Sequence, residues 1–379
     1  MYQLNKTLMK DLLKTLIAYP TVSTDTHANA EALTYIASYL EKRGMFVARY
    51  SQNGHDSIVA TTRNTKSPRV MLGAHLDVVP APPTAFQMTE DSGRLYGAGI
   101  CDMKFAIASY MQLVDELQDN LHDYDFGIMI VTDEEIGGRD GAKYLLETQG
   151  YRTKVCLIPD GGNDWVFEIA AKGVIWMTAT ATGVAAHASQ PWNGENAIEK
   201  LLLFLGAVKR DLFVEQGPLS STCNIGKISG GATANQVPDT CSADIDIRCT
   251  TQEEQTHILE KITAMSQDYG VDCVVHFSDS AIQIDLANPY VIAFTRHMER
   301  VLQEPLQTMR SNGGSDARYF AAYGIPTLVT YPVGGERHGG REWLEEKSLY
   351  QFHDILKGFV NDTANAKTPE PAELLTFSQ

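Results

Sequence analysis

The chain has 379 residues, more than one hydrophobic core usually holds, so about two domains are expected. Its formal net charge is −16, from 31 Lys and Arg against 47 Asp and Glu, which disfavours nucleic acid and anionic membranes as partners. The sequence has no apolar run near the roughly 20 residues of a membrane helix, no secretion signal in residues 1–20 and no disulfide-type spacing among its six cysteines, which together predict a cytoplasmic protein.

The first 160 residues alternate between helices and strands in the order typical of an α/β domain. Apolar periodicity and glycine or proline breaks predict these elements in order: helix 1–20, helix 30–43, strand 57–62, strand 70–76, a glycine-rich turn at 95–104 leading into a helix that ends near 117, strand 126–132, helix 141–148 and strand 155–158. Strand 70–76 is almost entirely apolar, so we expect it in the middle of the sheet.

From about residue 173 the pattern changes to strand, helix, strand, strand, helix, strand, which predicts an inserted ferredoxin-like layer. The elements expected there are strand 174–181, helix 197–213, strands 222–229 and 240–248, helix 253–269 and strand 272–277. A helix over 292–302 and a strand over 327–331 would complete the first domain. The expected domains are therefore 1–172 with 285–379, and 173–284, and the tail after Asn365 is expected to be frayed.

Polar side chains with metal-binding chemistry follow two of the predicted strands. His75 and Asp77 lie at the end of strand 70–76, and Asp133, Glu134 and Glu135 follow strand 126–132. Open α/β sheets bind ligands in the crevice outside the carboxyl ends of their strands, so both groups should open onto one cleft.

A site for two metal ions needs a few anionic or imidazole ligands from separate loops and a basic group that remains unligated. Five candidate ligands meet the first requirement, each at a predicted strand end or glycine-rich turn: His75, Asp102, Glu135, Asp160 and His338. Asp102, inside the turn at 97–104, is the expected bridge between the ions, and Asp77 is placed to hold the imidazole tautomer of His75. Glu134 and Glu135 would point opposite ways in an extended backbone, so that one binds metal while the other faces water.

Each of these residues has a plainer interpretation when it is taken alone. His75 would be a capped strand end, Asp160 beside Gly161 a turn residue, and His338 part of a loop surface. The pair Glu134 and Glu135 would be a solvated strand end. Their combination favours the metal site, and the glycine-rich turn lacks the third glycine and the preceding strand of a dinucleotide-binding site.

Four segments together resemble the M20 family of zinc peptidases and deacylases: Gly-Ala-His-Leu-Asp-Val-Val-Pro at 73–80, Gly-Ala-Gly-Ile-Cys-Asp-Met-Lys at 97–104, Thr-Asp-Glu-Glu at 132–135 and the late His338. That family includes acetylornithine deacetylase, succinyl-diaminopimelate desuccinylase, dipeptidases and carboxypeptidase G2-like enzymes. The resemblance implies an α/β fold, a mixed-sheet zinc-hydrolase catalytic domain interrupted by an α+β ferredoxin-like lid or dimerisation domain.

The resemblance also implies a role for each matching residue. Two Zn²⁺ ions, for which Co²⁺ or Mn²⁺ are substitutes, would be held by His75 and Asp160, by Glu135 and His338, and by Asp102 as the bridge, with Glu134 as general base and Asp77 as the partner of His75. His187, in Gly-Val-Ala-Ala-His-Ala-Ser, resembles the lid histidine that reaches the site of a neighbouring subunit, which implies a homodimer. The implied substrate-carboxylate contacts are Asn235, Arg248, Gly314 and Ser315.

The implied activity is hydrolysis of an amide bond in a small N-acyl amino acid or short peptide. Two alternatives remain open: a scaffold that keeps the fold and has lost the chemistry, and a non-hydrolytic enzyme with one metal ion. The chain departs from the family pattern at Phe105, where relatives often have glycine, and in Gly314-Ser-Asp, where a threonine is usual. Asp160 is typical of aminopeptidase-like and dipeptidase members, whereas deacylases and carboxypeptidases of the family usually carry glutamate there, so the aspartate favours a dipeptide-type substrate.

Overall fold

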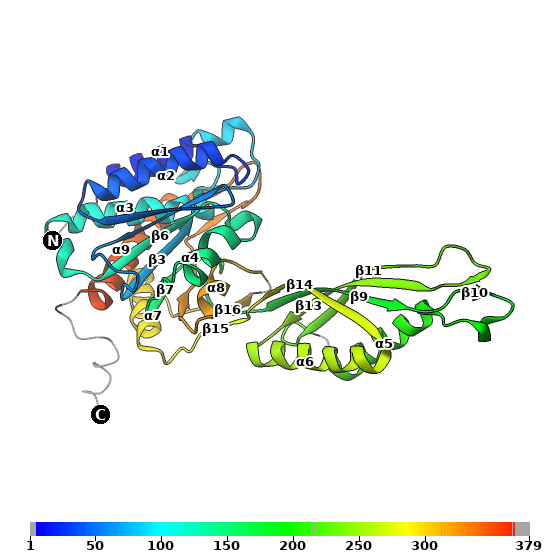
Figure 1. The fold of residues 1–379 in the computed structure, drawn as a ribbon. Coiled ribbons are helices and arrows are strands. Elements are labelled where there is room, and N and C mark those ends of the chain that lie inside the picture. The colour runs from blue at the N-terminus through cyan, green and yellow to red at the C-terminus, as the bar shows by residue number, and fades with distance from the viewer. Residues whose placement is uncertain (1–4, 216, 312, 366, 368–379) are drawn as a thin grey trace, which may run out of the picture. The chain divides into compact units, whose positions relative to one another are not determined.

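The structure is a computed structural model that describes residues 5–215, 217–311, 313–365 and 367. The chain divides into two compact units (Figure 1). The first takes in the chain up to Ile169, the stretch Ile284–Ser311 and the chain from Ser315 onward, and the second is Ala170–Gln283 with residues 313–314. Apart from Lys367, the tail after Asn365 that was expected to be frayed lies outside the described residues.

The first unit is built from alternating helices and strands, as expected. Its elements are α1 (Lys6–Ala18), α2 (Thr26–Glu41), β1 (Phe46–Gln52), β2 (His55–Thr61), β3 (Val70–His75), β4 (Thr89–Asp91), β5 (Arg94–Tyr96), α3 (Phe105–Leu117), β6 (Phe126–Val131), α4 (Tyr144–Glu147), β7 (Val155–Leu157), α7 (Pro289–Leu302), β16 (Thr308–Ser311), α8 (Ala317–Ala321), β17 (Thr327–Leu328), β18 (Gly334–Gly335), β19 (Trp343–Glu345) and α9 (Glu346–Thr363). Strand β8 (Phe167–Ala171) runs across the division between the units.

A six-stranded sheet with the order β1-β2-β6-β3-β7-β17 forms the centre of the first unit. Strands β6, β3, β7 and β17 are parallel, and β1 and β2 pair antiparallel at one edge, so the sheet is mixed. Every residue of β3 and of β6 is buried, which confirms the central position predicted for strand 70–76. Because side chains alternate between the two faces of a strand, this burial means that both faces of the sheet are covered, and helices lie on either side of it in Figure 1.

Helix α3 lies deep in the core, with 11 of its 13 residues buried. Its Phe105 packs edge-on against Phe352 of α9, with ring centroids 5.0 Å apart. Helix α9 was not predicted from the sequence. Its apolar residues nevertheless recur at intervals of three and four: Leu349, Phe352, Leu356, Phe359 and Val360. That spacing is the pattern of a helix with one buried face, so the signal was present.

Three local expectations are corrected. Glu134 and Glu135 lie in a short 3-10 turn, Glu134–Ile136, and not in extended backbone, because the chain turns directly after β6. The helix expected over 141–148 is regular only over Tyr144–Glu147, and the strand expected over 327–331 only over Thr327–Leu328. Strand β1, at the edge of the sheet, was not predicted.

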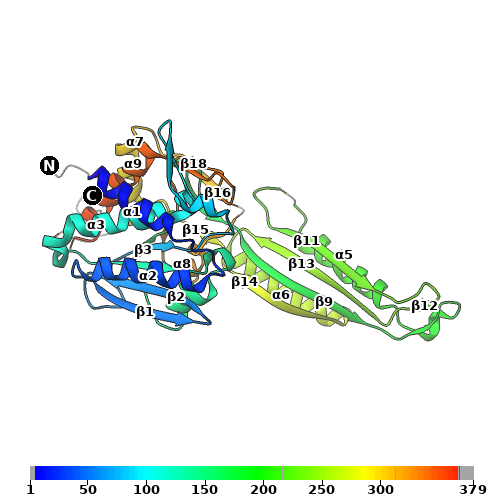
Figure 2. The same ribbon diagram turned by 90° about the horizontal axis from the view of Figure 1, so that it is seen from above.

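The second unit contains the predicted order of strand, helix, strand, strand, helix, strand. Its elements are β9 (Gly173–Thr182), β10 (Ala186–His187), α5 (Ala197–Leu212), β11 (Thr222–Gly230), β12 (Gln236–Val237), β13 (Thr240–Cys249), α6 (Gln252–Tyr269), β14 (Val271–Asp279) and β15 (Ile282–Gln283). The four long strands pair antiparallel in the order β11-β13-β9-β14, and every second residue of β9 from Ile175 to Ala181 is buried in a core with residues of α5 and α6. Figure 2 shows these two helices beside the sheet. The expected α/β fold with a mixed sheet and an inserted α+β layer is thus confirmed.

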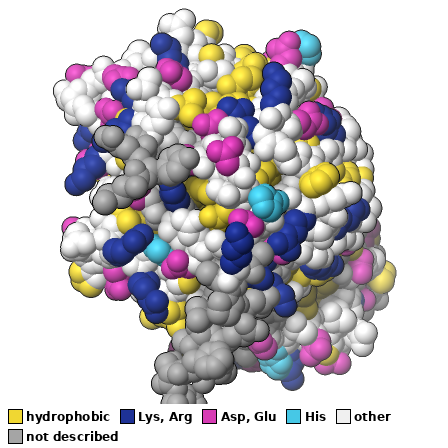
Figure 3. Space-filling view, turned by 90° about the vertical axis from the view of Figure 1, so that its left-hand side faces the viewer, with side chains coloured by type: hydrophobic (Ala, Val, Ile, Leu, Met, Phe, Trp, Pro, Cys, Tyr) yellow, Lys and Arg dark blue, Asp and Glu magenta, His cyan; other side chains and the backbone are white. Residues whose placement is uncertain are grey.

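Charged side chains of both signs are mixed on the surface in Figure 3. On the face in Figure 3, Lys and Arg side chains of the described residues are interspersed with Asp and Glu, so the charge of −16 does not form one acidic patch there. Among the described helices, none has the length and apolarity needed to cross a membrane.

Candidate active site

The ends of three adjacent parallel strands carry the candidate ligands of the first unit. His75 is the last residue of β3, Glu134 and Glu135 follow β6, and Asp160 follows β7. Because β6, β3 and β7 are neighbours and run in the same direction, their carboxyl ends meet at one edge of the sheet.

Asp102 and His338 reach this edge from a small second sheet with the order β18-β19-β5-β4. His338 lies in the loop between β18 and β19, and Asp102 lies in the turn after β5, with which β19 pairs. Gly99 begins that turn with φ +72°, and a Cβ there would lie 2.6 Å from Val78, so glycine is required. The peptide bond between Asp102 and Met103 is cis.

The carboxylate of Asp102 lies between two imidazoles. Its Oδ1 is 3.0 Å from Nε2 of His75, and its Oδ2 is 3.3 Å from Nε2 of His338. The same nitrogen of His338 is 3.1 Å from Oε1 of Glu135. A residue that bridges two ions offers one carboxylate oxygen to each ion. Asp102 is oriented for this, because each of its oxygens faces a different histidine.

The donor atoms fit divalent cations. Two groups have all their ligand atoms within 4.8 Å of one another: His75 with Asp102 and Glu135, and His75 with Glu134 and Asp160. Imidazole nitrogens and carboxylate oxygens together are the ligand set of Zn²⁺ and similar borderline ions. The second group includes Glu134, which the sequence analysis had placed beside the metal ligands as the base.

The carboxylates of this cluster titrate abnormally. Burial, and then the negative charge of Asp160, raise the pKa of Glu134 well above its usual value. Burial and the charge of Asp102 raise the pKa of Asp160 to about 7. Burial would raise the pKa of Asp102 too, but hydrogen bonds with His338 and His75 hold it well below the ordinary value. Crowded, buried negative charges of this kind are stabilised by a nearby positive charge.

Asp77 holds the backbone of the turn after β6. Its carboxylate oxygens accept hydrogen bonds from the N–H groups of Glu134 and Glu135, both 3.2 Å long, and from the hydroxyl of Ser23 at 2.8 Å. The hydrogen-bond partner of His75 Nδ1 is the main-chain carbonyl of Asp77, at 2.9 Å, whereas the carboxylate is 3.6 Å away. Asp77 therefore positions both the histidine and the two glutamates.

Three residues that contribute to the site were not predicted from the sequence. Glu342 accepts hydrogen bonds from three N–H groups of the turn that carries Asp102. Arg337 places Nη1 3.6 Å from Oδ1 of Asp160. Glu342 and Arg337 lie four residues after and one before His338, so closeness to a predicted ligand was the available signal.

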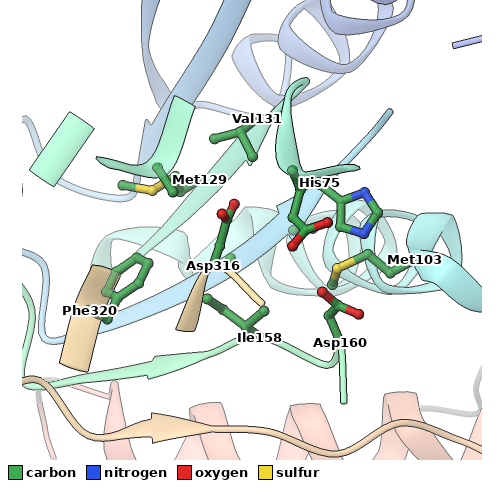
Figure 4. Close-up of a pocket in the computed structure, with 12 residues that line it drawn as sticks. His75, Met103, Met129, Val131, Ile158, Asp160, Asp316 and Phe320 are labelled. Atoms are coloured by element: carbon green, nitrogen blue, oxygen red, sulfur yellow. The ribbon is translucent and has the colours of Figure 1, made fainter. Parts of the chain in front are cut away.

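Asp316 is the third missed residue. Figure 4 shows its carboxylate pointing between Val131 and Ile158, with His75 and Asp160 on another side of the same pocket. Burial raises the pKa of Asp316 well above its usual value. Asp316 follows Ser315, which was predicted as a substrate contact. Ser315 itself is buried in the fold, so the prediction identified the right loop but not the residue that faces the pocket.

The predicted lid histidine, His187, and the other predicted substrate contacts belong to the second unit. His187 pairs with Gln236 in the β10–β12 ribbon, and the carbonyl of Asn235 accepts the N–H of Ala188, so these two predicted residues are neighbours. Arg248 makes a two-bond contact with Asp246, with distances of 2.7 and 3.0 Å. Gly314 is exposed and groups with this unit.

The ends of a mixed α/β sheet thus gather His, Asp and Glu side chains that could hold a metal ion. The chain belongs to peptidase family M20/M25/M40, whose model matches residues 71–362. The family resemblance read from the motifs is confirmed, and the family is by its description one of peptidases.

Three known proteins illustrate the similarity. A probable carboxypeptidase of Paracoccidioides brasiliensis (strain Pb03) is 29% identical over 299 residues, covering 71% of this chain and 66% of the relative, so the chain matches just under two thirds of that relative's length. Succinyl-diaminopimelate desuccinylase of Xylella fastidiosa (strain M12) is 26% identical, covering 92% of this chain and 96% of the enzyme. A Staphylococcus aureus tripeptidase structure is 20% identical, has a TM-score of 0.71 and covers 95% of this chain and 98% of its own, which supports the fold.

Proposed function

We propose that this protein hydrolyses an amide bond in a small N-acyl amino acid or short peptide, with two divalent cations, Zn²⁺ in the first instance, as cofactors. The observation that carries this proposal is the carboxylate of Asp102, which has His75 at one oxygen and His338 at the other, with Glu135 beside His338. Co²⁺ and Mn²⁺ accept the same nitrogen and oxygen ligands and would serve as substitutes.

The proposed ligands fall into two sets that share Asp102. His75 and Asp160 would hold one cation, and Glu135 and His338 the other. When bound, such cations supply a lowered pKa for water and polarisation of the scissile carbonyl.

Glu134 is the proposed general base. Its carboxylate is in the same cluster as Asp160 and His75 and is assigned to neither cation, so it would remain able to accept a proton beside them. Glu134 would take a proton from the attacking water and deliver it to the leaving nitrogen. Asp77 fixes the main chain of Glu134 for this role.

The comparisons support both substrate types without separating them. The relatives are described as a carboxypeptidase, a desuccinylase and a tripeptidase, which act on peptide or acyl-amide bonds by those names. Asp160, where deacylases usually have glutamate, favours a dipeptide.

The second unit is proposed to act as the lid and the dimerisation domain. His187 is exposed and lies beside Asn235, so both are available to a substrate, and in a homodimer His187 would stabilise the developing oxyanion in the neighbouring subunit. Arg248 would bind the substrate carboxylate only after release from Asp246. We place the enzyme in the cytoplasm, where free thiols such as the six cysteines persist.

The test combines a substrate panel with one variant. Zinc-loaded wild type should hydrolyse members of a panel of N-acyl amino acids and dipeptides, and Glu134→Gln should keep its metal content while kcat falls by about 10²–10⁴-fold. Glu31→Gln is the matched control, because that side chain is exposed. A metal-loaded wild type without turnover on any panel member would favour the silent scaffold, and near-normal kcat in Glu134→Gln would remove that residue from its role.

A further inference from the structure

Arg337 is a cation placed among the side chains proposed to bind metal. Its Nη1 is 3.6 Å from Oδ1 of Asp160 and 4.0 Å from Oδ2 of Asp102. The proposed function assigns no role to Arg337. A positive charge at this place opposes the binding of divalent cations, so its presence requires another explanation.

The loop backbone directs this side chain to the site. Glu336 and His338, on either side of Arg337, have φ values of +54° and +59°, the left-handed region that residues other than glycine rarely adopt. Consecutive side chains of an extended chain point in opposite directions, yet Arg337 and His338 both reach Oδ2 of Asp102. The unusual backbone is therefore linked to the convergence of the two side chains.

The guanidinium is also supported from one side and open on another. Its central carbon lies 4.5 Å from the ring centroid of Tyr331, whose hydroxyl bonds Oδ1 of Asn163 at 2.9 Å. The side chain of Arg337 nevertheless retains 32% of its exposure, so solvent and a small ligand can reach it. A stacked arginine with free edges is suited to two-bond recognition of a carboxylate.

Metal binding would change the partners of Arg337. Cations held by Asp160 and Asp102 would take the same oxygens that now face the guanidinium. With the cations bound and all four groups ionised, Asp102, Glu134, Glu135 and Asp160 would carry four negative charges, which two divalent cations match. The charge of Arg337 is then left for an anion beside the proposed ligands Asp160 and Asp102.

We infer that Arg337, in place of Arg248, which Asp246 holds in a two-bond contact, binds the substrate carboxylate attached to the carbon that bears the scissile nitrogen. This inference rests on the proposed function and narrows it: the substrate class is N-acyl α-amino acids and peptides cleaved at their last peptide bond, including dipeptides. A peptide bond further from the carboxyl end would leave the guanidinium without its anion.

The test uses one N-acyl amino acid and its carboxamide, which differ only in the charged group. Wild type should prefer the carboxylate by about 100-fold in kcat/KM, the size expected for a two-bond charged contact, mainly through KM. Arg337→Gln should lose most of that preference while its kcat/KM for the carboxamide stays within about threefold, and Arg337→Lys should recover part of it. Arg341→Gln is the matched control, since Arg341 stacks on Tyr96 at 5.4 Å in the same loop.

Three results would overturn the inference. A wild type that does not distinguish the two compounds removes its basis, and an equal loss on both compounds in Arg337→Gln indicates a structural or oxyanion role. If wild type hydrolyses neither of the two compounds nor any other member of the panel, the proposed function fails. The role of Arg337 is then still tested by the zinc affinity, measured by competition with a chelator. Removing the positive charge in Arg337→Gln should tighten zinc binding by at least about threefold. Unchanged affinity would contradict competition between Arg337 and the cation for Asp160 and Asp102.

Discussion

Glu342 provides a quantitative test of how the turn that carries Asp102 is held. Its Oε1 accepts the N–H groups of Cys101 and Asp102 at 2.7 and 2.9 Å, and its Oε2 accepts the N–H of Gly99 at 2.8 Å. In Glu342→Gln the amide oxygen can keep two of these bonds, but the amide NH₂ then faces the third N–H group. One charge-assisted hydrogen bond is lost and two donors oppose each other.

The expected size of the effect follows from that lost bond. A hydrogen bond to a charged group contributes about 1.5–3 kcal/mol. If the turn must keep its shape for Asp102 to bridge two ions, that loss corresponds to about 10–100-fold weaker metal binding, which is the range seen when a partner of a metal ligand is removed. Burial raises the pKa of Glu342 to about 7, so the loss should be larger at pH 8 than at pH 6, where the wild-type carboxyl is mostly protonated.

The assay is competition for Zn²⁺ between the protein and a chelator at pH 8. Glu345→Gln is the control, because Glu345 lies three residues further along in β19 and makes none of these hydrogen bonds. Zinc affinity in Glu342→Gln within about threefold of wild type, or an equal loss in Glu345→Gln, would refute the assignment of Glu342 to the positioning of Asp102.

Two further predictions concern acid stability and assembly. Burial alone would raise the pKa of Glu116, but hydrogen bonds from His353 and Lys357 lower it to about 2, so about 3 kcal/mol of stability is present above pH 4.5 and is lost as the pH falls toward 2. Glu116→Gln should therefore flatten the dependence of Tm on pH in that range, and an unchanged slope would contradict the assignment. His187→Ala should lose activity, and mixing it with Glu134→Gln should restore part of it, because a mixed dimer holds one site with both side chains; no recovery, with a monomer in light scattering, would exclude the contribution in trans.

Local sequence patterns were enough to predict most of the fold. The apolar run of β3 and the alternating run of β9 give the burial expected of a central and of a half-exposed strand. The parallel pairing of β3 with its neighbours brings His75 and Asp160 to the same edge, where the sequence analysis expected two of the predicted ligands to meet. Asp102 and His338 were candidate ligands from their glycine-rich turns, and the family motifs then implied a role for each of them.

The supporting contacts could not be predicted because they join distant parts of the chain. The N–H of Asp102 meets a carboxylate 240 residues later, and the direction of Arg337 depends on left-handed backbone on both sides of it. Neither feature leaves a periodic pattern. Asp77 was predicted as a partner of His75, but its bonds to the N–H groups of Glu134 and Glu135 depend on a turn that sequence analysis had treated as extended.

The electrostatics of the cluster favour a functional over a structural role for its carboxylates. Asp102 and Asp160 keep only 8% and 10% of their side-chain exposure, and burying charge without full compensation costs more than apolar packing of similar volume. A fold that needed only stability would not place both beside Glu134, which shares their sign. The pKa values of Asp160 and Glu134 are raised by this burial and crowding, which a bound cation would offset. The same crowding that destabilises the cluster without metal would therefore favour cation binding, which links the proposed metal requirement to the sequence positions where three strands end.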